Sequence, residues 1–304
     1  MDEKRFPVEA RFYETEPEVQ VLVHSQRPAG APLAEIVMVH GLEGSSDAGY
    51  ARSLAQAALV AGYAAHRFNM RSCAGTEHLS GKALYHSGQT SDLLAVLRQI
   101  KSDAPVFLAG FSLGGNVVLK LAGELGESAK ELVAGVTAVS TPIDLAACAQ
   151  RLQAPVNFIY SNRFLRRLKQ RVRLKDRLRP GTFGLADLNL GSLKSVYEFD
   201  DKVTARAFGF GTADNYYATQ SANQFLDRIR VPALLVQAKD DPLIPFEVYN
   251  HPAFASNPWL RLFAVDHGGH LGFVAKTKPR FWLDEVLVQW MEKVRNKMPA
   301  DLVL

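Results

Sequence analysis

The stretch GFSLGG, residues 110–115, decides how the rest of the sequence is interpreted. The apolar run 105–109 before it fits a buried strand, and the run after it has the composition of a helix. A serine at the tip of such a turn has a strained backbone, and Gly110 and Gly114 leave free the space that a Cβ atom would fill. The turn would hold the Ser112 hydroxyl clear of the sheet, at the positive end of the following helix. The sequence therefore predicts a nucleophile elbow at Ser112.

Apolar runs that fit strands alternate with stretches that fit helices over much of the chain. The predicted strands are 9–14, 19–24, 35–39, 64–70, 105–111, 131–140, 233–238 and 260–265, and the predicted helices are 48–61, 88–101 and 113–126. The first two strands are predicted to form an antiparallel edge. Strands that alternate with helices make a mainly parallel, doubly wound sheet, so the predicted fold class is α/β.

Residues 142–230 break this alternation, because nearly ninety residues pass without a clear strand. A crossover in this kind of fold normally needs far fewer residues. The sequence therefore predicts a core made of residues 1–141 and 231–304, with residues 142–230 inserted as a helical cap or lid.

The first half of this insertion has the pattern of a basic amphipathic helix. Phe164, Leu165, Leu168 and Val172 fall within about a 100° arc. The expected outward residues are Arg163, Arg166, Arg167 and Arg173. This basic face is either a solvated outer surface of the lid or a surface that makes weak contact with an anionic membrane or an acidic substrate.

A serine nucleophile needs a base, and the base needs a third group to orient it. Two motifs supply candidates: DDP at residues 240–242 directly follows the strand 233–238, and HGGH at residues 267–270 follows the next strand. Loops at the carboxyl ends of strands are where open α/β sheets build their sites. The order Ser, Asp, His along the chain is that of the α/β-hydrolases. Together these features predict an α/β-hydrolase with a Ser–Asp–His triad.

Two pairs of residues compete for the acid and the base. Asp241 is the preferred acid because it stands immediately before proline, which leaves Asp240 to cap a turn. His270 is the preferred base because it follows Gly269 and lies further into its loop than His267. The predicted triad is therefore Ser112, Asp241 and His270, with Asp240 as the open alternative for the acid.

An acyl-transfer site also needs N–H donors for the oxyanion. The N–H of Leu113, directly after the nucleophile, is one candidate, and the loop HGLEG at residues 40–44 supplies the second. The predicted donors are the backbone N–H groups of Leu42 and Leu113. His40 is expected to shape this loop through hydrogen bonds.

Composition sets the remaining expectations. A content of 47% hydrophobic and 22% charged residues in 304 is ordinary for a globular protein. The first residues contain no apolar segment typical of a signal peptide or membrane span, so a cytoplasmic protein is expected. Cys73 and Cys148 lack metal-ligand spacing, and we expect neither a metal nor a cofactor. The net charge of +4 comes without a basic–aromatic pattern, so no nucleic-acid partner is expected.

The sequence resembles the YheT-like family of bacterial α/β-hydrolases, relatives of the eukaryotic abhydrolase-domain lipases. The motifs that carry the resemblance span the chain: HGLEGSS (40–46), NMRSCAGT (69–76), GFSLGGN (110–116), FGFGTADNYY (208–217), AKDDPLIP (238–245) and HGGHLGF (267–273). The chain departs from the common pattern at Cys73, where a small residue is more usual. The N-terminal membrane anchor of the eukaryotic relatives is not expected here. The resemblance implies an esterase or lipase for carboxylic esters that uses Ser112, Asp241 and His270.

The substrate class stays open at this point. A thioesterase or an amidase would use the same residues, and a binding protein could share the fold without catalysis. The expected partner is a small-molecule acyl ester. Tyr216 and Tyr217 are expected either to line the acyl pocket or to pack the cap onto the core.

Overall fold

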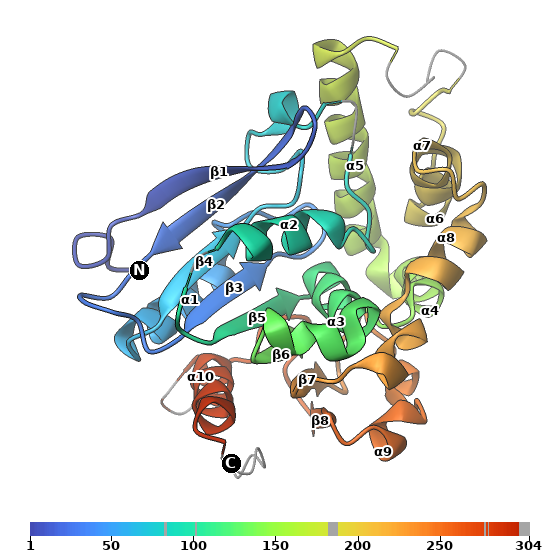
Figure 1. Cartoon of the computed structure of the whole chain (residues 1–304). Coiled ribbons are helices and arrows are strands. Elements are labelled where there is room, and N and C mark those ends of the chain that lie inside the picture. Colours follow the sequence, from blue (N-terminus) through green and yellow to red (C-terminus); the bar gives the residue numbers. More distant parts are fainter. Residues whose placement is uncertain (82–83, 101, 182–187, 277, 279, 298–304) are drawn as a thin grey trace.

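A computed structural model describes residues 1–81, 84–100, 102–181, 188–276, 278 and 280–297. Its centre is a single eight-stranded sheet (Figure 1) with the order β1-β2-β4-β3-β5-β6-β7-β8. The strands are β1 (Glu9–Glu16), β2 (Val19–Gln26), β3 (Glu35–Val39), β4 (Ala64–Phe68), β5 (Val106–Phe111), β6 (Gly135–Val139), β7 (Ala233–Ala238) and β8 (Leu260–Val265).

The pairing of the strands confirms the predicted sheet. β1 and β2 form an antiparallel hairpin at one edge, and β2 pairs antiparallel with β4. The six strands from β4 to β8 are parallel to one another. Because parallel strands end at the same edge of a sheet, the loops that follow β3, β5, β7 and β8 all open on one side.

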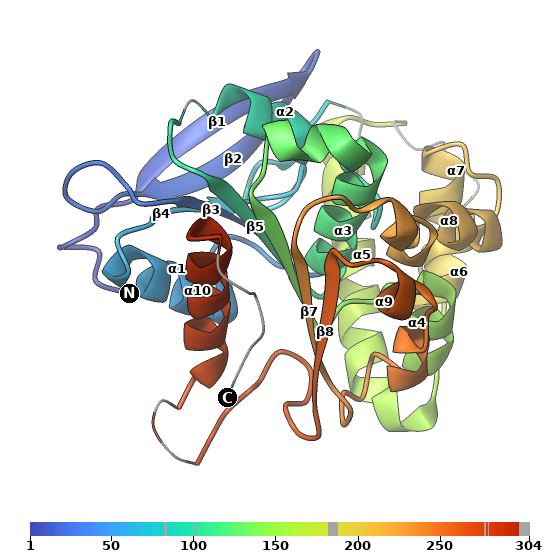
Figure 2. The same cartoon turned by 60° about the horizontal axis from the view of Figure 1, so that its bottom comes forward.

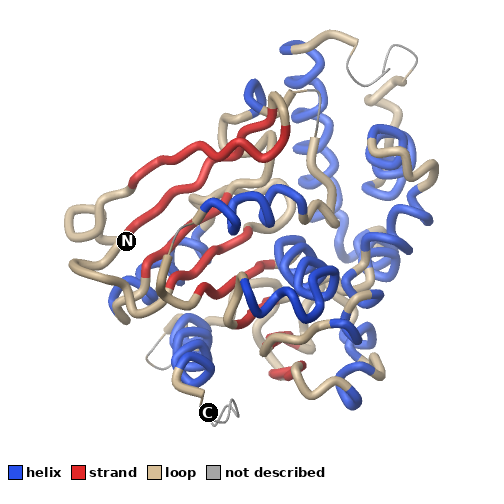
Figure 3. The backbone as a smooth tube through the Cα atoms, viewed as in Figure 1, coloured by secondary structure: helices blue, strands red, loops and turns tan. Residues whose placement is uncertain are grey.

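Helices cover both faces of the sheet (Figure 3). Helices α1 (Gly49–Val60) and α10 (Trp282–Arg295) lie side by side on one face (Figure 2), and α2 (Ser91–Gln99) and α3 (Leu113–Leu125) lie on the other. All five residues of β3 are buried, with Ile36 and Met38 in the core under α1 and α10, and Val37 and Val39 in the opposite core. Because neighbouring residues of such a strand enter the cores on opposite faces of the sheet, its sequence is a nearly continuous apolar run.

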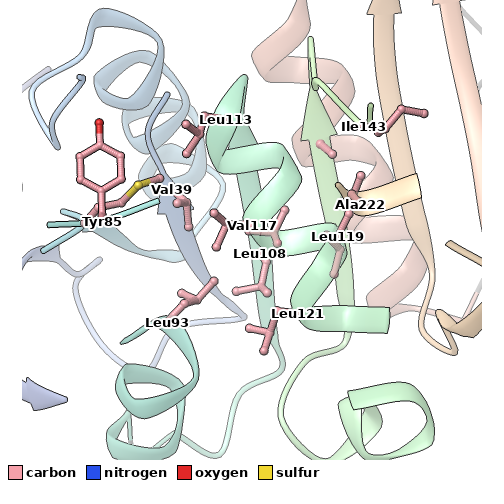
Figure 4. Close-up of a cluster of buried hydrophobic side chains, with 14 of the residues drawn as sticks. Val39, Tyr85, Leu93, Leu108, Leu113, Val117, Leu119, Leu121, Ile143 and Ala222 are labelled. Carbon is pink, nitrogen blue, oxygen red and sulfur yellow. The ribbon is translucent and has the colours of Figure 1, made fainter. Parts of the chain in front are cut away.

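The core between the sheet and α3 lies directly beneath the predicted elbow. Figure 4 shows Val117 of α3 beside Leu108 of β5, with Leu113 near the top of the same cluster. All three side chains are buried. This packing fixes the N-terminal end of α3, and therefore the turn that precedes it.

Between β6 and β7 the described residues form helices and no strand. We call this part of the chain the β6–β7 segment; its α-helices are α4 (Leu145–Leu152), α5 (Phe158–Leu178), α6 (Val196–Phe199), α7 (Ala205–Ala207) and α8 (Ala213–Gln220). A short helix, α9 (Ala253–Ser256), follows β7. Figures 1 and 2 show α4 to α8 gathered on one side of the sheet. No helix in the described part of the chain has the length and apolar character needed to cross a bilayer.

Helix α5 is longer than the amphipathic helix that the sequence predicts over residues 162–173. Its buried residues include Leu165, Leu168 and Val172, as expected, and Phe164 is half-buried. Of the four arginines predicted to point outward, Arg163, Arg166 and Arg173 are exposed.

The prediction was wrong for Arg167, which is half-buried and donates a hydrogen bond to the backbone carbonyl of Glu43 at 3.3 Å. Two further basic residues of α5, Arg171 and Lys175, also turn inward. The basic face is therefore narrower than the sequence indicates.

Candidate active site

The backbone at Ser112 has the strained conformation predicted for it. Ser112 has φ 52° and ψ −122°, a combination that non-glycine residues rarely adopt. A Cβ atom at Gly110 would lie 2.3 Å from the carbonyl oxygen of Gly114, and one at Gly114 would lie 2.2 Å from that of Val39. Only glycine fits at these two positions, and the Ser112 N–H is held by the carbonyl of Val139 at 2.8 Å.

A chain of hydrogen bonds joins three side chains from three different loops. Ser112 Oγ lies 3.0 Å from His270 Nε2, and His270 Nδ1 lies 2.9 Å from Asp241 Oδ2. The other oxygen of Asp241 accepts the N–H groups of Leu243 and Ile244 at 2.9 and 3.2 Å. Because a carboxylate can only accept, His270 carries its proton on Nδ1 and turns the Nε2 lone pair toward Ser112.

The competing residues Asp240 and His267 lie outside this chain. His267 is 90% exposed, and its Nδ1 lies 3.2 Å from Asp240 Oδ2. Asp240 accepts the N–H groups of Gly268 and Gly269 at 2.9 and 2.8 Å, and these bonds, led by that of Gly269, lower the pKa of its carboxyl. Asp240 therefore holds the loop that carries His270, while Asp241 contacts His270 itself.

The loop after β3 is fixed on both sides of Leu42. The N–H of Gly41 donates to the hydroxyl of Tyr50 at 3.0 Å, and the N–H of Glu43 donates to the hydroxyl of Tyr85 at 2.8 Å. Leu42, Leu113 and Ser112 line the same cavity. Tyr50 and Tyr85 thus hold the backbone on either side of Leu42, one of the two predicted oxyanion donors.

His40 shapes this loop, as the sequence predicts. Its Nδ1 donates to the carbonyl of Gly41 at 2.8 Å, and its Nε2 accepts the N–H of Met70 at 3.2 Å. The side chain is buried, and burial lowers its pKa to about 4. His40 is therefore neutral at physiological pH, with one fixed tautomer.

An ion pair ties helix α5 to this loop, and the sequence analysis did not find it. Arg171 Nε and Nη2 donate to the two carboxylate oxygens of Glu43 at 2.8 and 2.9 Å. The hydroxyl of Tyr85 donates to the same carboxylate at 3.0 Å. Glu43 has a φ of 55° and directly follows Leu42. The β6–β7 segment is thus attached to the residue beside a predicted oxyanion donor.

We expect Arg171→Met to lower both stability and turnover, because it leaves the buried Glu43 carboxylate without its cation. Loss of one partner of a buried ion pair costs about 3–5 kcal/mol. The double variant Arg171→Met/Glu43→Gln should regain much of this stability, since no unpaired charge remains. Urea unfolding and kcat for the two single variants and the double variant test this. An Arg171→Met protein that matches the wild type in both measurements would contradict a role for the ion pair.

Ser112 and His270 open on a cavity of about 120 Å³ between the sheet and the β6–β7 segment. Most of its lining is apolar, and helices α4, α5 and α6 contribute a large group of the apolar residues. These apolar residues include Leu145, Ala149, Leu152, Phe164, Leu168, Val172, Val196 and Phe199. Tyr216 and Tyr217 line the cavity and pack against Leu145 and Ala149 of α4, which belong to the same segment. The hydroxyl of Tyr216 also accepts the N–H of Ser87 at 2.7 Å, so this tyrosine joins the segment to the predicted core.

Two carboxyl groups line this cavity, that of Glu43 described above and that of Asp200. Asp200, at the start of a π-helical turn (Asp200–Thr204), accepts the hydroxyls of Tyr217 and Thr204, each at 2.7 Å. Burial raises its pKa to about 6 despite these two bonds. No sequence pattern singled out Asp200, because its partners come from different turns of the segment.

Metal-binding residues do not cluster in the described part of the chain. There, no group of three or more histidine, cysteine, aspartate or glutamate side chains could hold a metal ion. Cys73 and Cys148 are both buried and unpaired. Burial raises the pKa of Cys73 to about 12, so this thiol stays protonated.

The family match and the similar proteins point to the same fold family. The sequence profile of the family described as "alpha/beta hydrolase fold" matches residues 35–277. The chain is 34% identical over 276 residues to YheT of Escherichia coli (strain K12), named as a candidate esterase, with 89% of this chain and 80% of YheT covered. It is 29% identical over 265 residues to a mouse protein named phospholipase ABHD3, covering 84% of this chain and 63% of that protein.

Solved structures agree on the fold. An esterase of Pyrococcus furiosus, Pf2001, superposes with a TM-score of 0.62 at 17% identity, covering 96% of this chain and 93% of the esterase. Est1E from Butyrivibrio proteoclasticus gives 0.60 at 13% identity, covering 94% and 98%. The family match and the identity to YheT confirm the resemblance noted in the sequence. The chain belongs to the α/β-hydrolase fold family and, within it, to the group that contains YheT.

Proposed function

We propose that this protein hydrolyses carboxylic esters through an acyl-enzyme on Ser112. The observation that carries the proposal is the continuous hydrogen-bonded chain from Ser112 through His270 to the buried Asp241. The names of the two relatives reported above, esterase and phospholipase, support the same class of substrate. The apolar cavity beside Ser112 suits an acyl chain.

The mechanism follows from the positions of these groups. Ser112 Oγ attacks the ester carbonyl while His270 Nε2 takes its proton, and the Asp241 carboxylate stabilises the imidazolium that forms. The N–H groups of Leu42 and Leu113 would stabilise the oxyanion. His270 then gives the proton to the leaving alcohol, and a water molecule, activated by the same base, releases the acid from Ser112.

We further propose that residues 142–230 act as a cap over this site. Helices α4, α5 and α6 supply much of the apolar lining, so the segment would decide which acyl chains fit. The cytoplasmic location expected from the N-terminal residues stays a prediction.

A series of p-nitrophenyl esters tests the proposal. We expect kcat/KM to rise about three- to fourfold for each methylene added beyond acetate, because each buried methylene contributes ~0.8 kcal/mol, and to level off once the cavity is filled. The Ser112→Ala protein is the background control. Turnover that does not exceed this control with any ester would favour the alternative of a binding protein on the same fold.

The thioesterase and amidase alternatives need a different comparison. Butyryl esters, thioesters and anilides share one acyl chain and differ only in the leaving group. We expect the ester to give the highest kcat/KM. If a thioester or an anilide is cleaved faster and its cleavage still requires Ser112, the assignment of the nucleophile stands and the assigned substrate class changes.

A further inference from the structure

Large apolar side chains are exposed to solvent at the start of helix α5. Val156 is 73% exposed, Phe158 67% and Ile159 79%, and Tyr160 beside them is also exposed. We call residues 156–160 the apolar tip. Single exposed apolar residues are ordinary on a protein surface, whereas several large ones exposed within five residues are typical of an interaction site.

The apolar tip is held rigidly from inside. Asn157, in its middle, is buried, and its side-chain amide donates to the carbonyls of Arg151 and Pro242 at 3.0 and 2.8 Å. Pro242 directly follows Asp241 in the chain. One inward-facing polar residue thus anchors the tip to the loop of the candidate acid, while its neighbours face solvent.

The tip also borders an opening that leads to Ser112. A second depression in the surface is lined by Tyr160, Arg163 and Phe164 of α5, and Ser112 and His270 lie in the same depression. A molecule that enters from the side of the tip would therefore reach the candidate nucleophile directly.

Exposed arginines flank the tip along the chain, although the opening is also lined by Asp47, whose side chain is 60% exposed. Arg151, Arg163 and Arg166 are exposed, and in the described residues no carboxylate forms an ion pair with any of them. Basic residues near a surface of anionic lipid contribute favourable binding, while aliphatic and aromatic side chains insert at the headgroup level. A second copy of the chain is a less suitable partner for the tip. A twofold contact would place Arg163 and Arg166 close to the same arginines of the other copy, and these like charges repel.

We propose that the apolar tip docks on the surface of an anionic phospholipid bilayer, with the opening beside Ser112 facing the lipid. This placement differs from the broad basic face expected from the sequence, since Arg167 is engaged with Glu43. Docking does not depend on the proposed hydrolysis, and binding can be measured with the Ser112→Ala protein.

Vesicle flotation tests the proposal, with phosphatidylcholine containing about one third phosphatidylglycerol, at low and at physiological salt. We expect the wild type to float, and the double variant Phe158→Ser/Ile159→Ser to partition at least about tenfold less. The matched control is Phe12→Ser/Val60→Ser, which removes exposed apolar side chains elsewhere and should bind like the wild type. Arg163→Glu/Arg166→Glu should weaken binding to these vesicles at low salt.

Hydrolysis of soluble p-nitrophenyl butyrate separates docking from folding and catalysis. The Phe158→Ser/Ile159→Ser protein should keep this activity within about twofold, because neither side chain lines the cavity or the opening. Three results would overturn the proposal: wild-type protein that stays unbound at every salt concentration, a tip variant that floats like the wild type, or a wild-type dimer in light scattering that the tip variant abolishes.

Discussion

The Ser112→Ala protein is expected to lose roughly 10⁴- to 10⁶-fold in kcat while it keeps its fold. The hydroxyl that lies 3.0 Å from His270 is the only group removed, and alanine keeps a Cβ at the strained position. His270→Ala should cost about as much, since the hydroxyl then has no base. Esterase assays with far-UV circular dichroism as the control for folding measure both.

The double variant tests whether these two residues act as a unit. If Ser112 loses its nucleophilic character without His270, Ser112→Ala/His270→Ala should be hardly slower than either single variant. If the losses of the two single variants multiply in the double variant, the two side chains contribute independently. That result would contradict a shared role for Ser112 and His270.

Asp241→Asn is expected to lower kcat by roughly 10⁴-fold with little change in the site's geometry. The asparagine amide can donate a hydrogen bond to His270 Nδ1. The imidazole would then carry its proton on Nε2, and this nitrogen could no longer accept the proton of Ser112. Asp240→Asn should lower kcat by less than about tenfold, because the asparagine oxygen can still accept the Gly268 and Gly269 N–H groups. Parallel pH–rate profiles of the two variants make the comparison.

The reverse order of effects would assign the acid to Asp240. That outcome is hard to reconcile with the structure, in which Asp240 is 42% exposed and contacts His267. The 2.9 Å contact between Asp241 and His270, and the burial of Asp241, are the reasons for the assignment.

The elbow could be predicted from the sequence because the glycine pattern that it requires is local. Gly110 and Gly114 are close in sequence to Ser112. The atoms that exclude a Cβ at Gly110 belong to the same turn, and those at Gly114 belong to the end of β3, the neighbouring strand in the sheet. Most of the parallel strands were predictable for a similar reason, since a strand buried on both faces is mainly apolar, although β4 also buries His66 and Arg67.

The contacts of helix α5 could not be predicted in this way. Arg171 and Glu43 are 128 residues apart, so no periodicity relates them. Lys175 belongs to the same basic run, yet it is buried and donates to the carbonyls of Glu77 and Gly81. Amphipathic patterns separate apolar from charged residues, and they do not reveal which charged side chains find buried partners.

The C-terminal helix α10 was missed although its signal is present. The predicted elements end at residue 265, yet Leu283, Leu287 and Trp290 recur at helical spacing and are buried against the sheet. The exposed tip of α5 is the opposite case: its apolar residues look like core in the sequence, and only the structure places them in water.

Reaction with a fluorophosphonate, located by peptide mass spectrometry, tests most directly whether Ser112 is a nucleophile activated by His270. We predict one adduct, on Ser112, no adduct in the Ser112→Ala protein, and labelling slowed by at least about 100-fold in His270→Ala. An adduct on a different residue, or His270→Ala protein labelled as fast as the wild type, would contradict it.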